Sequence, residues 1–139
     1  KIFHAHDGVG LVMLREAGLK IAVISARSSP AVEKRMTALE IEYVFQGQSD
    51  KRKVINELMQ KIGVKNEHVA FVGDDLVDLA AMSVVGLAIA VANAQAIVLE
   101  KADWVTSKTG GRGAVREVCE MILDAQGKLE TAYKHYVPD

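Results

Sequence analysis

Apolar runs alternate with helical patterns along the whole chain. Short runs rich in valine, isoleucine and alanine are typical of strands that are buried on both faces of a parallel sheet. Between the runs, apolar residues recur every three or four positions, as they do on one face of a helix. The runs predict strands over residues 19–25, 41–46, 68–73, 86–92 and 103–107.

The segments between the runs carry helix start and stop signals. Ser29 and Pro30 suit an N-cap and a first helical residue, Asp50 suits a second N-cap, and Gly63 suits a C-terminal stop. Residues 130–139 show no clear period, and we expect this tail to be mobile. The predicted helices span residues 7–18, 29–40, 50–62, 76–84, 94–102 and 113–128.

Apolar strands separated by helices indicate a parallel sheet that is covered by helices on both faces. Right-handed crossovers then give a doubly wound, Rossmann-like α/β domain with three α/β/α layers. The length of 139 residues predicts one domain, 1–139. In such sheets ligands bind at the carboxyl ends of the strands, so the residues that close each strand are the candidates for chemistry.

Composition narrows the classes of function. The net charge of −1 provides no basic surface for nucleic acid. No apolar run reaches the roughly 18 residues of a membrane span, and no signal peptide is visible. Cys119 is the only cysteine, which excludes an internal disulfide and fits a reducing compartment, so we expect a cytoplasmic protein.

An acidic cluster follows the third predicted strand. Asp74, Asp75 and Asp78 lie within five positions, and Asp74 and Asp78 would share a face of a helix that begins there. A hard divalent cation relieves the repulsion between such carboxylates, and Mg²⁺ takes one or two carboxylates together with waters and phosphate oxygens. The alternative is helix N-capping, which favours the same residue type.

Two earlier strand ends supply groups that suit a phosphoryl group. Ser25 closes the first strand, and Lys51 follows the second. A hydroxyl, an ammonium group and a metal-binding carboxylate act on phosphoryl oxygens by positioning and by charge neutralisation. The residues therefore predict a phosphoryl-transfer site that lacks a nucleophile.

The segments VISAR, QSDK, VGDDLVD and TSKTGGRGAVREVCEMILDAQGKL resemble the haloacid dehalogenase superfamily. Within it, the chain resembles the small capless phosphatases of 3-deoxy-D-manno-octulosonate 8-phosphate (KDO 8-phosphate), over residues 1 to about 129. The resemblance implies a Mg²⁺-dependent phosphatase with an aspartyl-phosphate intermediate. It also implies a homotetramer whose neighbouring subunits close the active site, and a product, KDO, that enters lipopolysaccharide biosynthesis.

The resemblance also implies roles for individual residues. Asp74 matches the carboxylate ligand of Mg²⁺, and Asp7 and Gly8 match a loop that lines the substrate pocket. The residues with implied catalytic roles are Ser25, Lys51, Asp75 and Asp78, and of these Asp75 and Asp78 would orient Lys51 and the waters of the metal. The residues with implied substrate-binding roles are His4, His6, Asp7, Gly8, Arg27, Arg35, Lys51 and Arg112.

The chain departs from the family at two kinds of position. The Asp-x-Asp-Gly strand with the nucleophile would lie upstream of Lys1, so we expect either a fragment or a protein without catalysis, and no turnover from these 139 residues alone. His4, His6 and Ser28 stand where the family usually has asparagine, arginine and lysine. Loss of an arginine weakens bidentate pairing with a sugar-acid carboxylate.

Three hypotheses follow from these observations. The first is a sugar-acid phosphate phosphatase that is completed by upstream strands. The second is a non-catalytic domain that serves oligomerisation or regulation of a sugar-acid activating enzyme, and an upstream Asp-x-Asp-Gly sequence separates the first from the second. The third, a phospho-acceptor signalling domain, would have its acidic pair at the end of the first strand.

Overall fold

The computed structural model describes residues 4–138, in which helices alternate with strands. The helices are α1 (Ala5–Glu16), α2 (Pro30–Ala38), α3 (Lys51–Ile62), α4 (Leu79–Met82), α5 (Ala96–Lys101), α6 (Ala114–Ala125) and α7 (Leu129–Lys134). The strands are β1 (Ala22–Ile24), β2 (Tyr43–Phe45), β3 (Ala70–Gly73), β4 (Leu87–Ala90) and β5 (Trp104–Val105). Two 3₁₀ turns are η1 (Asn66–His68) and η2 (Leu76–Asp78).

The helix boundaries follow the signals in the sequence. Ser29 accepts a backbone N–H from the first turn of α2, and Pro30 is the first residue of that helix. The Asp50 side chain caps α3 in the same way, and Gly63 ends α3 in the left-handed region at φ 79°. These predictions are confirmed. They could be made from the sequence because each cap depends only on neighbouring backbone groups.

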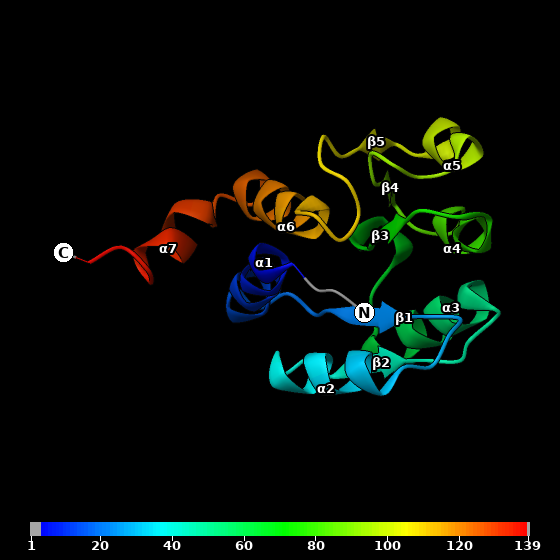
Figure 1. The fold of residues 1–139 in the computed structure, drawn as a ribbon, viewed down its shortest axis with the longest axis horizontal. Helices are drawn as coiled ribbons and strands as arrows, with labels where there is room; N and C mark the ends of the chain where they lie inside the picture. The colour runs from blue at the N-terminus through cyan, green and yellow to red at the C-terminus, as the bar shows by residue number, and fades with distance from the viewer. Residues whose placement is uncertain (1–3, 139) are drawn as a thin grey trace.

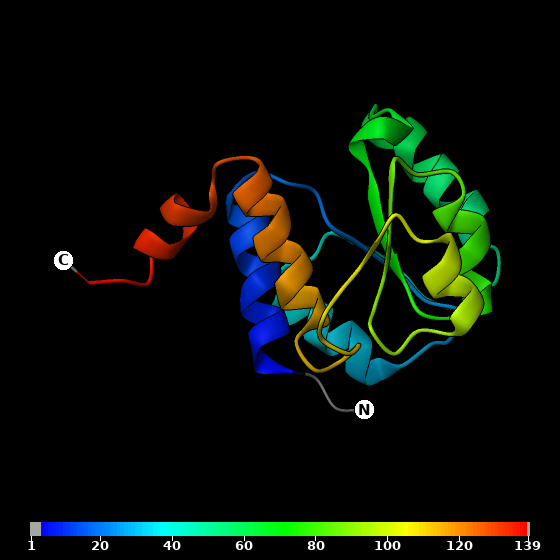
Figure 2. The ribbon, with the colours of Figure 1, turned by 90° about the horizontal axis from the view of Figure 1, so that it is seen from above.

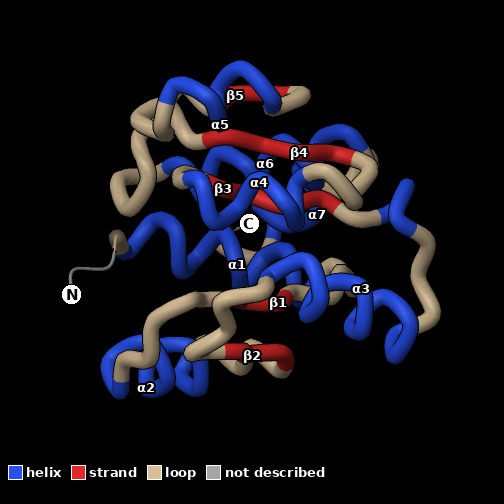
Figure 3. The backbone as a smooth tube through the Cα atoms, turned by 90° about the vertical axis from the view of Figure 1, so that its right-hand side faces the viewer, coloured by secondary structure: helices blue, strands red, loops and turns tan. Residues whose placement is uncertain are grey.

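The strands form two parallel sheets. β1 pairs with β2, and β3, β4 and β5 pair in that order. Figure 3 shows the spatial order β5, β4, β3, β1, β2, so that β3 and β1 are neighbours across a break. Within residues 4–138 no strand ladder joins these two edges. We call β1–β2 and β3–β4–β5 the two half-sheets.

Helices cover both sides of the strands. α1, α2 and α6 lie on one side, and α3, α4 and α5 lie on the other (Figures 1 and 2). The two half-sheets are held together by these layers, since α1 packs against α6 and α3 packs against α4. The predicted three-layer α/β/α fold is confirmed.

Burial differs between the two half-sheets. Ile89 and Ala90 of β4 are completely buried. In β1, Ala22 is exposed and Val23 and Ile24 are half-buried. The prediction of a strand buried on both faces is therefore wrong for β1, because among the described residues β1 pairs on one edge only and its other edge faces the break.

Two further segments differ from the prediction. The helix expected over residues 76–84 is a 3₁₀ turn followed by the short α4, because Asp75 and Asp78 form a capping box that tightens the first turn. The tail expected to be mobile contains α7, which packs on α6 through Leu129 and Ala132. No helix among the described residues is long and apolar enough to span a bilayer.

Candidate active site

A buried ion pair joins the ends of the two half-sheets. Lys51 Nζ lies 2.6 Å from Asp78 Oδ1, and the two side chains are 11% and 4% exposed. Lys51 begins α3 after β2, and Asp78 follows β3. The carboxyl ends of the two half-sheets therefore lie at one edge of the molecule, as a parallel α/β sheet requires.

Asp78 uses both carboxylate oxygens within this edge. Its Oδ2 accepts the backbone N–H groups of Asp74, at 2.9 Å, and Asp75, at 3.2 Å. Burial opposes ionisation, but the hydrogen bond from Lys51 and the two N–H groups outweigh it and lower the pKa of Asp78. Asp78 is therefore an ionised group that holds the ammonium of Lys51 in place.

Gly73 makes this arrangement of Asp78 possible. A Cβ at position 73 would lie 2.7 Å from the Cβ of Asp78 and 2.9 Å from the sulfur of Met82, closer than real contacts. The last residue of β3 must therefore lack a side chain for the Asp78 carboxylate to fold back under the strand end.

The three aspartates of the acidic cluster do different things. Asp78 binds Lys51, and Asp75 caps η2 by accepting the N–H of Leu76 at 2.7 Å. Asp74 is exposed, and partial burial and the charges of Asp78 and Asp75 raise the pKa of its carboxyl. Asp78 turns inward to the lysine, as the implied role of orienting Lys51 requires. A cation bound beside Asp74 and Asp78 stays a prediction.

Asp74 is exposed to solvent, and its role as a metal ligand stays a prediction. Burial first, and then the neighbouring carboxylates of Asp78 and Asp75, raise the pKa of the Asp74 carboxyl, and a bound cation would offset the part that comes from those charges. Residues 4–138 contain no group of three or more His, Cys, Asp or Glu side chains that could hold a metal. The described residues therefore fit part of a Mg²⁺ site, since this ion needs few carboxylates and completes its shell with waters and phosphate oxygens.

Ser25 lies at the end of β1, beside the loop that leads to Lys51. Its N–H donates to the carbonyl of Phe45 at 2.8 Å, and its carbonyl accepts the N–H of Gln48 at 2.9 Å. The hydroxyl accepts the N–H of Arg27 at 3.2 Å. The structure thus places Ser25 at the strand end that the sequence predicted, while Arg27 is exposed just beyond it.

Asp7 and Gly8 lie in the first turn of α1, as the helix predicted over residues 7–18 requires, and not in the loop that the resemblance implied. Asp7 Oδ1 accepts the N–H of Arg116 at 2.9 Å and so caps α6, whose own N-cap, Gly113, has no side chain. Gly8 is buried against the guanidinium of the half-buried Arg35, which occupies the space a Cβ would need. The substrate-binding roles of Asp7, Gly8 and Arg35 stay predictions.

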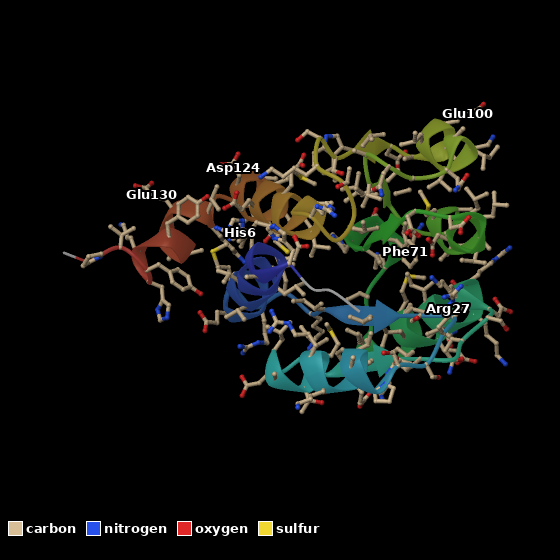
Figure 4. All side chains as sticks on the ribbon, in the orientation of Figure 1. His6, Arg27, Phe71, Glu100, Asp124 and Glu130 are labelled. Atoms are coloured by element: carbon tan, nitrogen blue, oxygen red, sulfur yellow. The ribbon has the colours of Figure 1, made fainter. Side chains whose placement is uncertain are left out.

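The other predicted substrate-binding residues are spread along the edge. The rings of His4 and His6 lie 4.7 Å apart at the start of α1. Arg112 is exposed in the loop before α6, and Figure 2 shows that this loop and the start of α1 lie at the same end of the molecule. Figure 4 shows His6 and Arg27 well apart, so one chain does not bring all of them together.

Two polar residues at this edge were missed from the sequence. Asn93 Oδ1 accepts the N–H of Gly110 at 2.8 Å, and the Glu117 carboxylate accepts N–H groups of Ser107 and Lys108 at 2.9 and 3.0 Å. Asn93 follows the fourth apolar run, so the search at strand ends could have found it. Glu117 had no such signal, because its role depends on how the loop folds back on α6.

Comparison with known proteins gives a consistent result. Residues 38–118 match the family model of the haloacid dehalogenase-like hydrolases. The chain is 44% identical over 132 residues to 3-deoxy-D-manno-octulosonate 8-phosphate phosphatase KdsC of Escherichia coli K12, covering 95% of this chain and 70% of that protein.

Solved structures show the same similarity in three dimensions. The 3-deoxy-D-manno-octulosonate 8-phosphate phosphatase of Moraxella catarrhalis, in complex with magnesium, phosphate and KDO, is 41% identical with a TM-score of 0.95. It is matched over 99% of this chain and 79% of that chain. A probable YrbI family phosphatase of Pseudomonas syringae is 45% identical with a TM-score of 0.97, over 100% and 79% of the two chains.

Proposed function

Because the chain belongs to the haloacid dehalogenase-like hydrolases and, within them, to the family of KDO 8-phosphate phosphatases, we propose that it hydrolyses a sugar-acid phosphate. The proposed substrate is KDO 8-phosphate, and the products are inorganic phosphate and KDO for lipopolysaccharide biosynthesis. The observation that carries the proposal is the buried Lys51–Asp78 pair beside the exposed Asp74, where both half-sheets end.

Mg²⁺ is the proposed cofactor, with Asp74 as its ligand from this chain. Bound there, the ion supplies positive charge to phosphate oxygens. The chain itself supplies Lys51, whose ammonium is fixed by Asp78 and whose remaining donors can reach a phosphoryl oxygen. The Ser25 hydroxyl is the proposed second donor to that phosphoryl group. Preorganised charges of this kind stabilise the transition state without further rearrangement.

The break between β1 and β3 is the proposed position of the strand that carries the nucleophile. Each of these strands has a partner on one edge only, and the open edges face each other. Neighbouring strands lie about 4.8 Å apart, so a parallel strand inserted there would pair with both. An aspartate at its carboxyl end would emerge between Ser25 and Asp74. Its carboxylate oxygen would bond to phosphorus as the bond from phosphorus to the sugar oxygen breaks, and the sugar oxygen would take a proton from the general acid of the same strand. Water would then hydrolyse the aspartyl-phosphate to inorganic phosphate and the free aspartate.

The substrate's sugar acid is anionic, and the cationic groups at this edge are its proposed partners. Arg27 and Arg112 are exposed, as free substrate-binding arginines must be. Arg35 is half-buried beside Gly8. His6 is exposed at the start of α1, and we propose that the arginines, whose charge and paired donors suit a carboxylate, provide most of the recognition.

Assembly as a homotetramer, with a neighbour closing each site, is also proposed. Leu76 and Val77 are 60% and 52% exposed and directly follow Asp74 and Asp75. Large apolar side chains beside a polar site are usually covered by a partner, and a second copy of the chain is the proposed partner. The cytoplasm is the proposed location, since the single cysteine is buried and no disulfide is needed.

The test uses the natural polypeptide that contains these residues, assayed with KDO 8-phosphate and Mg²⁺. Asp74→Ala should abolish Mg²⁺-dependent phosphate release while the fold is kept, because Asp74 is exposed and forms no ion pair within residues 4–138. Lys51→Ala should lower kcat by roughly 10²–10³, as loss of one preorganised charge does. The matched controls are the exposed Asp124→Ala on α6, labelled in Figure 4, and the exposed Lys53→Ala on α3.

The outcomes separate the proposed functions. Undiminished activity of Asp74→Ala would refute the metal assignment, and a mere doubling of KM in Lys51→Ala would count against the role of the lysine. If the natural polypeptide releases no phosphate from any sugar-acid phosphate but still assembles, the non-catalytic alternative is correct.

A further inference from the structure

The loop between β4 and α5 connects two parts of the edge that are far apart in sequence. At its two ends, the N–H of Val91 donates to the carbonyl of Gly73 at 3.3 Å, and the N–H of Gln95 donates to the carbonyl of Asp74 at 2.9 Å. The loop is therefore fixed to the strand end that carries the proposed metal ligand.

The middle of the same loop holds the segment before α6. Ala92 donates to the carbonyl of Lys108 at 3.3 Å, and Asn93 Oδ1 accepts the N–H of Gly110 at 2.8 Å. Gly110 fits closely here, since a Cβ would lie 3.3 Å from Val91. One short loop thus contacts both the Asp74 strand end and the segment that carries Arg112.

The segment around Arg112 is a turn that closes on itself. Gly111 and Gly113 have φ values of 73° and 107°, which glycine adopts readily, and the N–H groups of Arg112, at 3.1 Å, and Ala114, at 3.3 Å, donate to the carbonyl of Thr109. These bonds fix the shape of the turn but do not tie it to the Asp74 strand end.

On the N-terminal side of this turn, the backbone N–H groups of Ser107 and Lys108 donate to the carboxylate of Glu117. Gly110 lies between Lys108 and the start of α6. Its N–H donates to the Asn93 side chain, and this hydrogen bond links the turn to the loop that contacts the Asp74 strand end.

We propose that Asn93 is a positioning residue for Arg112: by holding the Gly110 amide, it sets the place of the Arg112 guanidinium relative to the Asp74 carboxylate. This inference rests on the proposed function, because it assumes that Arg112 contacts the sugar acid while Asp74 serves the phosphate end. Asn93 would then hold the Arg112 guanidinium and the Asp74 carboxylate at a separation that suits the length of the substrate.

The test compares Asn93→Ala with Asn93→Asp in the natural polypeptide. Alanine removes the acceptor for the Gly110 amide, whereas aspartate keeps one. For KDO 8-phosphate, Asn93→Ala should raise KM by about three- to tenfold, the range expected for one hydrogen bond, with little change in kcat. Asn93→Asp should restore KM. Amide hydrogen exchange should be faster at Gly110 in Asn93→Ala and normal in Asn93→Asp.

A double-mutant cycle with Arg112→Ala tests whether Asn93 acts through the arginine. Asn93→Ala should add little to the KM of Arg112→Ala. Additive effects, an unchanged KM in either single variant, or failure of Asn93→Asp to restore KM would overturn the proposal. If the unmutated polypeptide releases no phosphate, the proposed function fails, whatever the Asn93 variants show. If Asn93→Ala leaves the hydrogen exchange rate of the Gly110 amide unchanged, the proposal that Asn93 holds this amide is overturned.

Discussion

The two half-sheets show how much a parallel strand depends on a neighbour at each edge. β4 lies between two strands, and its Ile89 and Ala90 are 0% exposed. β1 has one partner, spans three residues and leaves Ala22 exposed. Yet both half-sheets end in residues of the proposed site. The site is thus built where the sheet is least complete, and its geometry depends on contacts that cross the break.

The Lys51–Asp78 pair is the contact across the break for which the largest effect is expected. Asp78→Ala would leave the buried Lys51 ammonium without its partner, because Lys51 is 11% exposed. The free energy of unfolding should fall by about 3–5 kcal/mol, as measured by urea denaturation. The exposed Asp124→Ala is the control, with an expected change within about 0.5 kcal/mol. A loss no larger than that of the control would show that the pair does not hold the half-sheets.

The contact between α1 and α6 across the same break should contribute less. Asp7→Ala removes the side-chain cap of α6, which should lower the free energy of unfolding by about 0.5–2 kcal/mol. Asp7→Asn keeps an acceptor oxygen for the Arg116 N–H and should recover most of this stability. If both variants unfold alike, charge rather than capping is the cause of the effect.

The smallest expected effect is on the dependence of stability on pH. The pKa of Asp78 is lowered from the value of 3.8 that applies in the unfolded chain. Its contribution is therefore fully present above pH 3.8 and is lost as the pH falls through the lower folded value. Urea midpoints measured across this acid range should fall less steeply for Asp78→Asn than for the unmutated chain. Equal slopes would mean that Asp78 is not held ionised by Lys51.

The sequence predicted the features that depend on local chemistry. Ser29, Asp50 and Gly63 set helix ends by direct contact with neighbouring backbone groups, and each appears where expected. The position of Ser25, Lys51 and the acidic cluster at one edge also followed, because parallel strands share their carboxyl ends.

The features that the sequence did not predict depend on tertiary contacts. The resemblance implied that Asp78 orients Lys51, but not that this contact depends on Gly73, which leaves room for the Asp78 side chain beneath the strand end. Asp7 caps α6 by accepting the N–H of Arg116, which is 109 positions away, and no local pattern records this contact. The exposure of β1 depends on a missing neighbour, whereas a run of apolar residues only indicates that a strand can be buried.

The central claim is that one further strand fits between β1 and β3 and completes the sheet. Amide hydrogen exchange of residues 22–24 and 70–73 tests it most directly, compared between the 139-residue chain and the natural polypeptide that contains it. The account predicts fast exchange at the open-edge amides in the shorter chain and slowing by orders of magnitude in the longer one. Equal exchange at both edges in the two proteins would contradict it.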